Sequence, residues 1–126
     1  MGEHMHLYAY TACMDVPHPL PDPLVELIAE RFRVIGEPMR IRLLDCLREA
    51  PATVQELTEA TGGTQPNVSR HLAVLHRAGI VGREKDGIHV RYAIADESVF
   101  ALCELVCGGL RRQLEVLDST LSWQPS

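Results

Sequence analysis

The chain has 126 residues and a net charge of −5 at pH 7, with 46% hydrophobic and 23% charged residues. These values are typical of one ordinary globular domain, small enough that dimerisation would add stability. No apolar run reaches membrane-spanning length and no secretory leader is visible, which argues against a membrane or secreted protein. We therefore expect a cytoplasmic location, where the four cysteines are thiols and not structural disulfides.

The N-terminal segment, residues 1–22, is expected to be an irregular arm because its prolines favour extended backbone. Residues 1–4, ahead of a second methionine, indicate a cloning remnant, so His4 and His6 are not interpreted as metal ligands. Cys13 is either a stray exposed thiol or a mobile ligand that closes over a site, and it ranks behind the other cysteines.

Two helices are predicted after this arm. Apolar residues recur at helical spacing at Leu24, Leu27, Ile28, Phe32 and Ile35. Gly36 ends this first helix, and Pro38 begins a second one that runs to Glu49. In the second helix we expect Ile41, Leu44 and Leu47 to face inward, with Leu43 and Cys46 beside them.

A helix-turn-helix is predicted to begin at Thr53. Thr53 followed by Glu56 forms a capping box, in which each side chain satisfies an orphan backbone N–H. The short helix buries Leu57 and ends where Gly62 and Gly63 allow a sharp turn.

The helix that starts at Thr64 carries the expected DNA-reading face. Val68, Leu72 and Leu75 recur at i, i+4 and i+7 and mark its buried stripe. Donor-rich side chains occupy the opposite face near the helix start, where a recognition helix contacts base edges. The predicted contacts are Thr64, Gln65, Asn67, Ser69, Arg70 and His71.

These side chains suit different parts of DNA. Gln65 and Asn67 suit adenine through bidentate amide pairing, and Arg70 suits guanine. Ser69 and His71 are expected to bind phosphates instead. The alternative to DNA contact is that this side of the helix is an ordinary solvated polar face.

A β-hairpin is predicted next, with strands at 80–84 and 89–94 around Asp86-Gly87, a pair that accepts positive φ. Ile88, Val90, Tyr92 and Ile94 alternate with other residues and form one apolar face. The fold class is therefore mainly α with a β-hairpin wing, a winged helix-turn-helix. The wing residues expected to touch the DNA backbone or minor groove are Arg83, Lys85, His89 and Arg91.

The negative net charge argues at first against DNA, but the distribution of charge matters more. Residues 64–92 carry five basic and two acidic side chains, a local charge of +3, which leaves −8 for the rest. A basic reading face on an acidic body still attracts phosphate locally.

Asp96 or Ser98 is expected to cap a long last helix that runs to about Leu117. Its apolar stripe comprises Val99, Leu102, Val106, Leu110, Leu114 and Leu117, widened by Cys103, Leu105 and Cys107. This surface is broader than a small domain needs, so the first and last helices are the predicted dimer interface. The domain is expected to span residues 23–118, followed by a tail from 119 to 126.

The segments FRVIGEPMRIRLLDCL, VQELTEATGGTQPNVSRHLAVLHRAGIV and DGIHVRYAI are similar to the ArsR/SmtB family of bacterial transcriptional regulators. The similarity covers about Phe32 to Leu117, and QPNVSRHLxxLxxAGIV is its most specific part. It implies a dimeric repressor on operator DNA that leaves when an inducer binds, usually a metal ion, a metalloid or a reactive sulfur species.

Two metal motifs of that family have no counterpart here. No cysteine lies at the family's Cys-x-Cys position around Val54 to Leu57, and the zinc-type positions hold residues 96–98 and 109–112. The remaining candidates are Cys46, Cys103 and Cys107. Sulfide- and persulfide-responsive relatives use one cysteine on each of these two helices, and Cys107 resembles the later one while Cys46 is displaced by a residue.

Cys103 and Cys107 stand at i and i+4 and present two sulfurs on one helix face. Thiolates select soft, thiophilic species. Three arrangements are open. A twofold axis near this helix would bring the partner's pair close and make a four-thiolate site. Alternatively, Cys46 would complete a three-sulfur site, or oxidation would link Cys46 to Cys107. The alternative is simple packing, because cysteine is a small hydrophobe common in cores.

A thiol enzyme is disfavoured, because no histidine lies near these cysteines in sequence and no phosphate-cradling glycine loop appears. The remaining alternatives to an inducible repressor are a ligand-independent winged-helix DNA binder and a protein-docking module with structural cysteines.

Overall fold

The computed structural model describes the backbone of residues 16–121 and side chains up to residue 116, so Cys13 and the proposed cloning remnant lie outside it. The elements are α2 (Asp22–Ile35), α3 (Pro38–Glu49), β1 (Ala52–Thr53), α4 (Val54–Thr61), α5 (Gln65–Arg77), β2 (Val81–Asp86), β3 (His89–Ile94) and α6 (Ser98–Leu121). The predicted fold class, mainly helical with a hairpin wing, is confirmed. No helix in the described part is long and apolar enough to cross a membrane.

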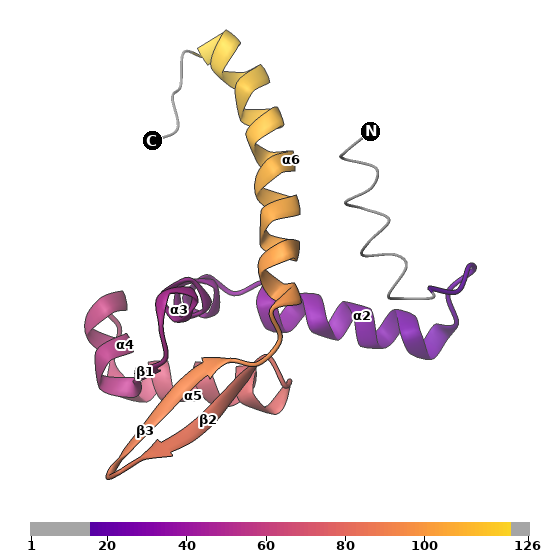
Figure 1. The fold of residues 1–126 in the computed structure, drawn as a ribbon. Coiled ribbons are helices and arrows are strands. Elements are labelled where there is room, and N and C mark those ends of the chain that lie inside the picture. The colour runs from indigo at the N-terminus through magenta and orange to yellow at the C-terminus, as the bar shows by residue number, and fades with distance from the viewer. Residues whose placement is uncertain (1–15, 122–126) are drawn as a thin grey trace.

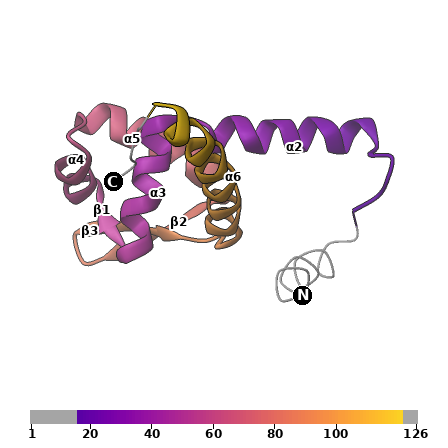
Figure 2. The same ribbon diagram turned by 90° about the horizontal axis from the view of Figure 1, so that it is seen from above.

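Helices α3, α4 and α5 form the body of the molecule, and α2 and α6 project from it (Figure 1). Seen from above, α2 extends past α6 on the side away from α4 (Figure 2). The two helices predicted to mediate dimerisation are therefore the two that leave the body.

The wing contains a third strand that the sequence did not reveal. The antiparallel strand order is β1-β3-β2, and Ala52 pairs with Tyr92 while Thr53 pairs with Arg91. Because β1 has two residues, it shows no periodicity that could have predicted it. The hairpin turn lies at Gly87, whose φ of 66° confirms the expected positive φ.

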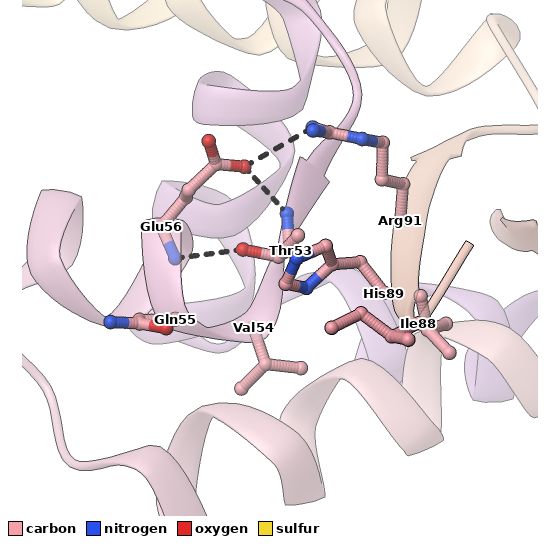
Figure 3. A pocket seen from close by; sticks show the side chains of 8 residues that line it. Thr53, Val54, Gln55, Glu56, Ile88, His89 and Arg91 are labelled. Carbon is pink, nitrogen blue, oxygen red and sulfur yellow. Dashed lines mark hydrogen bonds and ion pairs between the residues drawn. The ribbon is translucent and has the colours of Figure 1, made fainter. Parts of the chain in front are cut away.

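The capping box at the start of α4 is confirmed (Figure 3). Thr53 Oγ1 accepts a hydrogen bond from the Glu56 backbone N–H at 3.1 Å, and Glu56 Oε1 accepts one from the Thr53 N–H at 2.9 Å. Gly62 ends the helix with φ 73°, in the left-handed region.

Replacing Thr53 by alanine is expected to lower the free energy of unfolding by about 1 kcal/mol, because the Glu56 N–H loses its acceptor. Chemical denaturation followed by circular dichroism measures this. Thr58→Ala is the matched control, since the Thr58 hydroxyl donates only to a carbonyl of its own helix, that of Val54. An equal loss in both variants would contradict the role of the cap.

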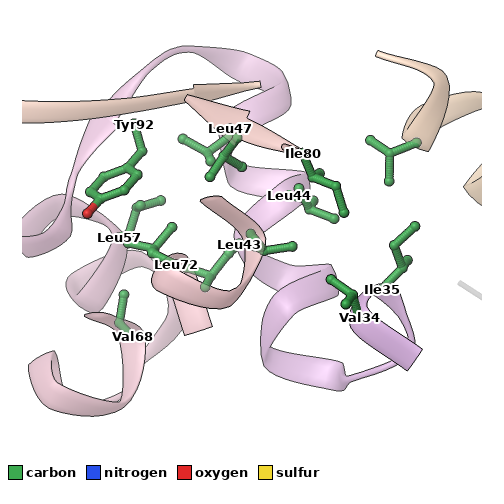
Figure 4. Close-up of a cluster of buried hydrophobic side chains, with 13 residues drawn as sticks. Val34, Ile35, Leu43, Leu44, Leu47, Leu57, Val68, Leu72, Ile80 and Tyr92 are labelled. Atoms are coloured by element: carbon green, nitrogen blue, oxygen red, sulfur yellow. The ribbon is translucent and has the colours of Figure 1, made fainter. Parts of the chain in front are cut away.

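The core lies between α3, α4, α5 and the root of the wing (Figure 4). The buried stripe of α5 is confirmed, because Val68, Leu72 and Leu75 are all 0% exposed. The most deeply buried side chains are Leu43, Leu57, Leu72, Leu75, Ile80, Val68 and Val81.

Two burial predictions were wrong. Ile41, expected to face inward, is 45% exposed, while Leu43, expected beside the inner face, is fully buried. The inner face of α3 turns toward α4 and α5, which leaves Ile41 on the side of α6. The apolar face of β3 is covered only at its root: Tyr92 is buried, but Ile88 is 93% exposed because the wing projects beyond the helices.

Candidate nucleic-acid interface

Helix α5 presents a polar face to solvent because its apolar stripe is anchored in the core. Thr64 caps the helix by accepting the Asn67 backbone N–H at 3.3 Å, so its hydroxyl is already engaged. Gln65, Ser69 and Arg70 are exposed and Asn67 is half-buried. The structure thus brings these predicted contacts together on the first turns of one helix.

Asn67 and Arg70 interact with one another on this face. Arg70 Nη2 donates to Asn67 Oδ1. This bond restrains both side chains before any partner arrives and leaves the Asn67 amide N–H groups free to donate. Because Oδ1 keeps a second lone pair, the pair still offers both donors and an acceptor to a base edge.

His71 does not lie on the reading face, contrary to the prediction from sequence. Its side chain is only 14% exposed, and Nδ1 lies 3.5 Å from Glu37 Oε2 and 3.1 Å from Arg40 Nη1. One residue is a rotation of about 100° on a helix, so the neighbour of Arg70 points back toward α3. Glu37 and Arg40 were missed because no local spacing connects them to α5.

The wing cations Arg83 and Lys85 are exposed on β2. In the antiparallel register they stand opposite Tyr92 and Val90, so they share the sheet face that packs on the helices at its root. Within the part of the chain that the structure describes, neither cation forms an ion pair. Both are free to attract phosphate.

Arg91, predicted to touch the DNA backbone or minor groove, forms two ion pairs within the protein. Its Nη1 lies 3.3 Å from Glu56 Oε1 (Figure 3). Its Nε lies 3.1 Å from Asp86 Oδ2. Two carboxylates therefore offset its charge, and Arg91 braces β3 against the start of α4. His89, by contrast, is exposed. With Arg91 and Glu56 it lines a groove of about 380 Å³ between β3 and the start of α4.

The pKa of Glu56 is lowered chiefly by the hydrogen bond from the Thr53 backbone N–H, against some opposing desolvation, and also by the nearby Arg91. The carboxylate thus stays ionised, which maintains both the cap of α4 and the brace to the wing.

The candidate sensing cysteines fall into two groups. Cys46 is half-buried against the core, and burial, with a smaller effect of Asp45, raises the pKa of its thiol. Cys103 and Cys107 line an apolar groove of about 530 Å³ between α2, the start of α3 and α6, which also contains Phe32. Cys46 does not line this groove.

The described side chains of one protomer do not assemble a metal site. Among the side chains that the structure describes, no three from His, Cys, Asp and Glu lie close enough to hold a metal ion. The three-sulfur site of Cys46, Cys103 and Cys107, one of the arrangements left open by the sequence, is therefore not present in this structure.

A helix-turn-helix with an amide- and guanidinium-bearing second helix, flanked by a basic hairpin, is the architecture of a winged-helix DNA-binding protein. Residues 37–82 match the family model described as bacterial regulatory protein, arsR family. The chain is also 36% identical over 97 residues to the HTH-type transcriptional repressor SmtB of Mycobacterium tuberculosis, covering 76% of this chain and 72% of SmtB. The chain belongs to the ArsR family of transcriptional regulators.

Two further similarities bear on function. Over 94 residues the chain is 35% identical to the probable mercury resistance operon repressor of Streptomyces lividans, covering 75% of this chain and 72% of that protein. The solved homodimeric winged helix-turn-helix domain of Mb0332 from Mycobacterium bovis matches with a TM-score of 0.66 and 26% identity, covering 79% of this chain and 94% of Mb0332. The protein is thus a DNA-binding transcriptional regulator.

Proposed function

We propose that the protein is a homodimeric repressor that occupies a pseudo-palindromic operator and leaves it when a thiophilic inducer acts on Cys103 and Cys107. The observation that carries this proposal is the apolar surface of α2 and α6, which contains both thiols. We place the repressor in the cytoplasm, where such thiols stay reduced.

The dimer is proposed to form through α2 and α6. Large apolar side chains remain exposed on both helices: Val25, Leu27, Phe32, Leu105, Val106 and Leu110. An apolar surface of this kind on a small domain marks an interaction site. The solved Mb0332 domain is homodimeric, which supports a dimer for this chain as well.

Two copies of α5 would then enter successive major grooves, with half-sites about one helical turn apart. Gln65, Asn67 and Arg70 are the proposed base contacts, and Ser69 contacts phosphate. Arg83, Lys85 and His89 on the wing contribute affinity that does not depend on sequence.

The inducer is proposed to be a soft metal or metalloid ion or a reactive sulfur species. Thiolate pairs favour such species, and a twofold axis close to α6 would add the partner's two thiolates to complete a four-sulfur site. The name of the Streptomyces relative, a probable mercury resistance operon repressor, fits this class. Binding would repack α6 and move the reading helices, provided that the ligand prefers the new arrangement.

Replacing Cys103 and Cys107 together by serine is expected to raise the inducer concentration needed for operator release by about tenfold or more. Release is measured by fluorescence anisotropy with arsenite, cadmium, zinc, polysulfide and peroxide in turn. Cys46→Ala is the matched control and is expected to respond like the wild type, because Cys46 packs against the core.

Two other outcomes of this experiment would contradict parts of the proposal. Loss of response in Cys46→Ala, with the double variant unaffected, would overturn the assignment of the sensor to α6. A wild-type protein that none of these species releases would favour the ligand-independent DNA binder.

A further inference from the structure

A half-buried polar network lies behind the reading face and joins three helices. Arg40 on α3 donates from Nε to the Val34 carbonyl at 2.6 Å and from Nη2 to the Arg33 carbonyl at 3.4 Å. Its Nη1 lies 3.1 Å from His71 Nδ1 on α5. Glu37, the N-cap of α3, accepts the Arg40 backbone N–H at 3.1 Å and lies 3.5 Å from the same imidazole nitrogen.

The chemistry of each contact is directional. The last carbonyls of a helix lack partners within it and carry partial negative charge, so the Arg40 guanidinium stabilises the end of α2. Since a guanidinium only donates, Arg40 is the donor and His71 Nδ1 the acceptor of this hydrogen bond. A planar guanidinium holds its contacts with the end of α2 and with His71 in one rigid plane, which an ammonium does not.

The Glu37 carboxylate completes the network. Burial acts to raise its pKa, but hydrogen bonds from the backbone N–H groups of Arg40 and Met39, together with the nearby His71 and Arg40 side chains, lower it overall. Glu37 is thus ionised beside the Arg40 guanidinium, and the two opposite charges offset one another.

We propose that Arg40, His71 and Glu37 are positioning residues that fix the orientation of α5 relative to α2. Apolar packing between helices is non-directional and permits small rotations, whereas this network has fixed angles. His71 directly follows Arg70, so a rotation of α5 that breaks the network also displaces a base contact.

The consequence lies in the dimer, and it rests on the proposed function. If α2 belongs to the dimer interface, the angle between α2 and α5 sets the distance between the two reading helices. The network would therefore determine which spacing of half-sites the protein accepts. No side chain of the network needs to touch DNA for this effect.

The test compares two duplexes. The first is selected by the wild-type protein from a pool of random sequences, and the second carries one extra base pair between its half-sites. The measured quantity is the affinity for the selected duplex divided by the affinity for the duplex with the extra base pair. In Arg40→Met and in His71→Leu, this ratio is expected to fall about tenfold, since hydrogen bonds to a charged group are lost. His71→Asn, which keeps a polar atom near the position of Nδ1, is expected to retain most of the wild-type ratio.

Thermal unfolding and sedimentation of each variant accompany these measurements. A merely structural role would lower thermal stability and weaken binding to both duplexes equally, with the ratio unchanged, and this result would overturn the proposal. Should Arg40→Met fail to fold, Arg40→Lys, which keeps the charge but not the planar fork, takes its place. A wild-type protein that is monomeric, or that selects no paired half-sites, would overturn the proposed function first, before any variant is made.

Discussion

Replacing Leu72 by alanine is expected to lower the free energy of unfolding by about 3 kcal/mol, the usual cost of removing a fully buried leucine side chain. Leu72 is 0% exposed and belongs to the same buried core cluster as Leu43 (Figure 4). Because the core is closely packed, removing this side chain leaves a cavity that the neighbouring side chains fill only in part. Chemical denaturation followed by circular dichroism, at one protein concentration, measures the loss.

Ile88→Ala provides the control for this prediction. Ile88 is 93% exposed at the tip of the wing, so its truncation is expected to change the free energy of unfolding by less than about 0.5 kcal/mol. If Leu72→Ala proved as mild as Ile88→Ala, the reading helix would not be anchored in the core as the structure describes.

Replacing Asn67 and Arg70 together by alanine is expected to weaken operator binding about a hundredfold, since each bidentate base contact contributes about 1–3 kcal/mol of discrimination. The two single substitutions are not expected to add, because Arg70 donates to the Asn67 side chain and each restrains the other. Fluorescence anisotropy on the selected duplex at fixed salt concentration measures the effect.

Arg42→Ala is the control for charge. Arg42 is exposed on α3, away from α5 and the wing, so this variant also loses one positive charge but no proposed base contact. Its effect on affinity is expected to be within about twofold, because salt screens distant exposed charges. A loss in Arg42→Ala comparable with that of the double variant would mean that net charge alone governs binding and that α5 does not read bases.

Much of the fold was predictable because it depends on neighbours in the chain. The capping box of α4 and the buried stripe of α5 connect residues a few positions apart, and both are confirmed. The left-handed glycines at the end of α4 and in the wing follow from local backbone sterics. The exposed donors of α5 follow from the same stripe, since they occupy the opposite side of one helix.

The site was predictable only in part, because some side chains find partners far away in sequence. His71 contacts Arg40 across 31 positions and Arg91 contacts Glu56 across 35, and no periodicity encodes either pair. From sequence alone, all four residues appear as polar groups on element surfaces. His71, predicted to contact DNA, instead joins α5 to α3, while Arg91 joins β3 to α4 and stays a predicted contact of the wing.

The order of the helices and the hairpin, the buried face of α5 and the similarity to the ArsR family could all be predicted from the sequence, since they depend on local spacing and motif. Tertiary structure alone decided that Ile41 faces α6, that a short strand joins the wing, and that Cys46 is separated from the groove of Cys103 and Cys107. The physical reason is that helix periodicity specifies which residues share a face. The packing of whole helices then specifies what each face meets.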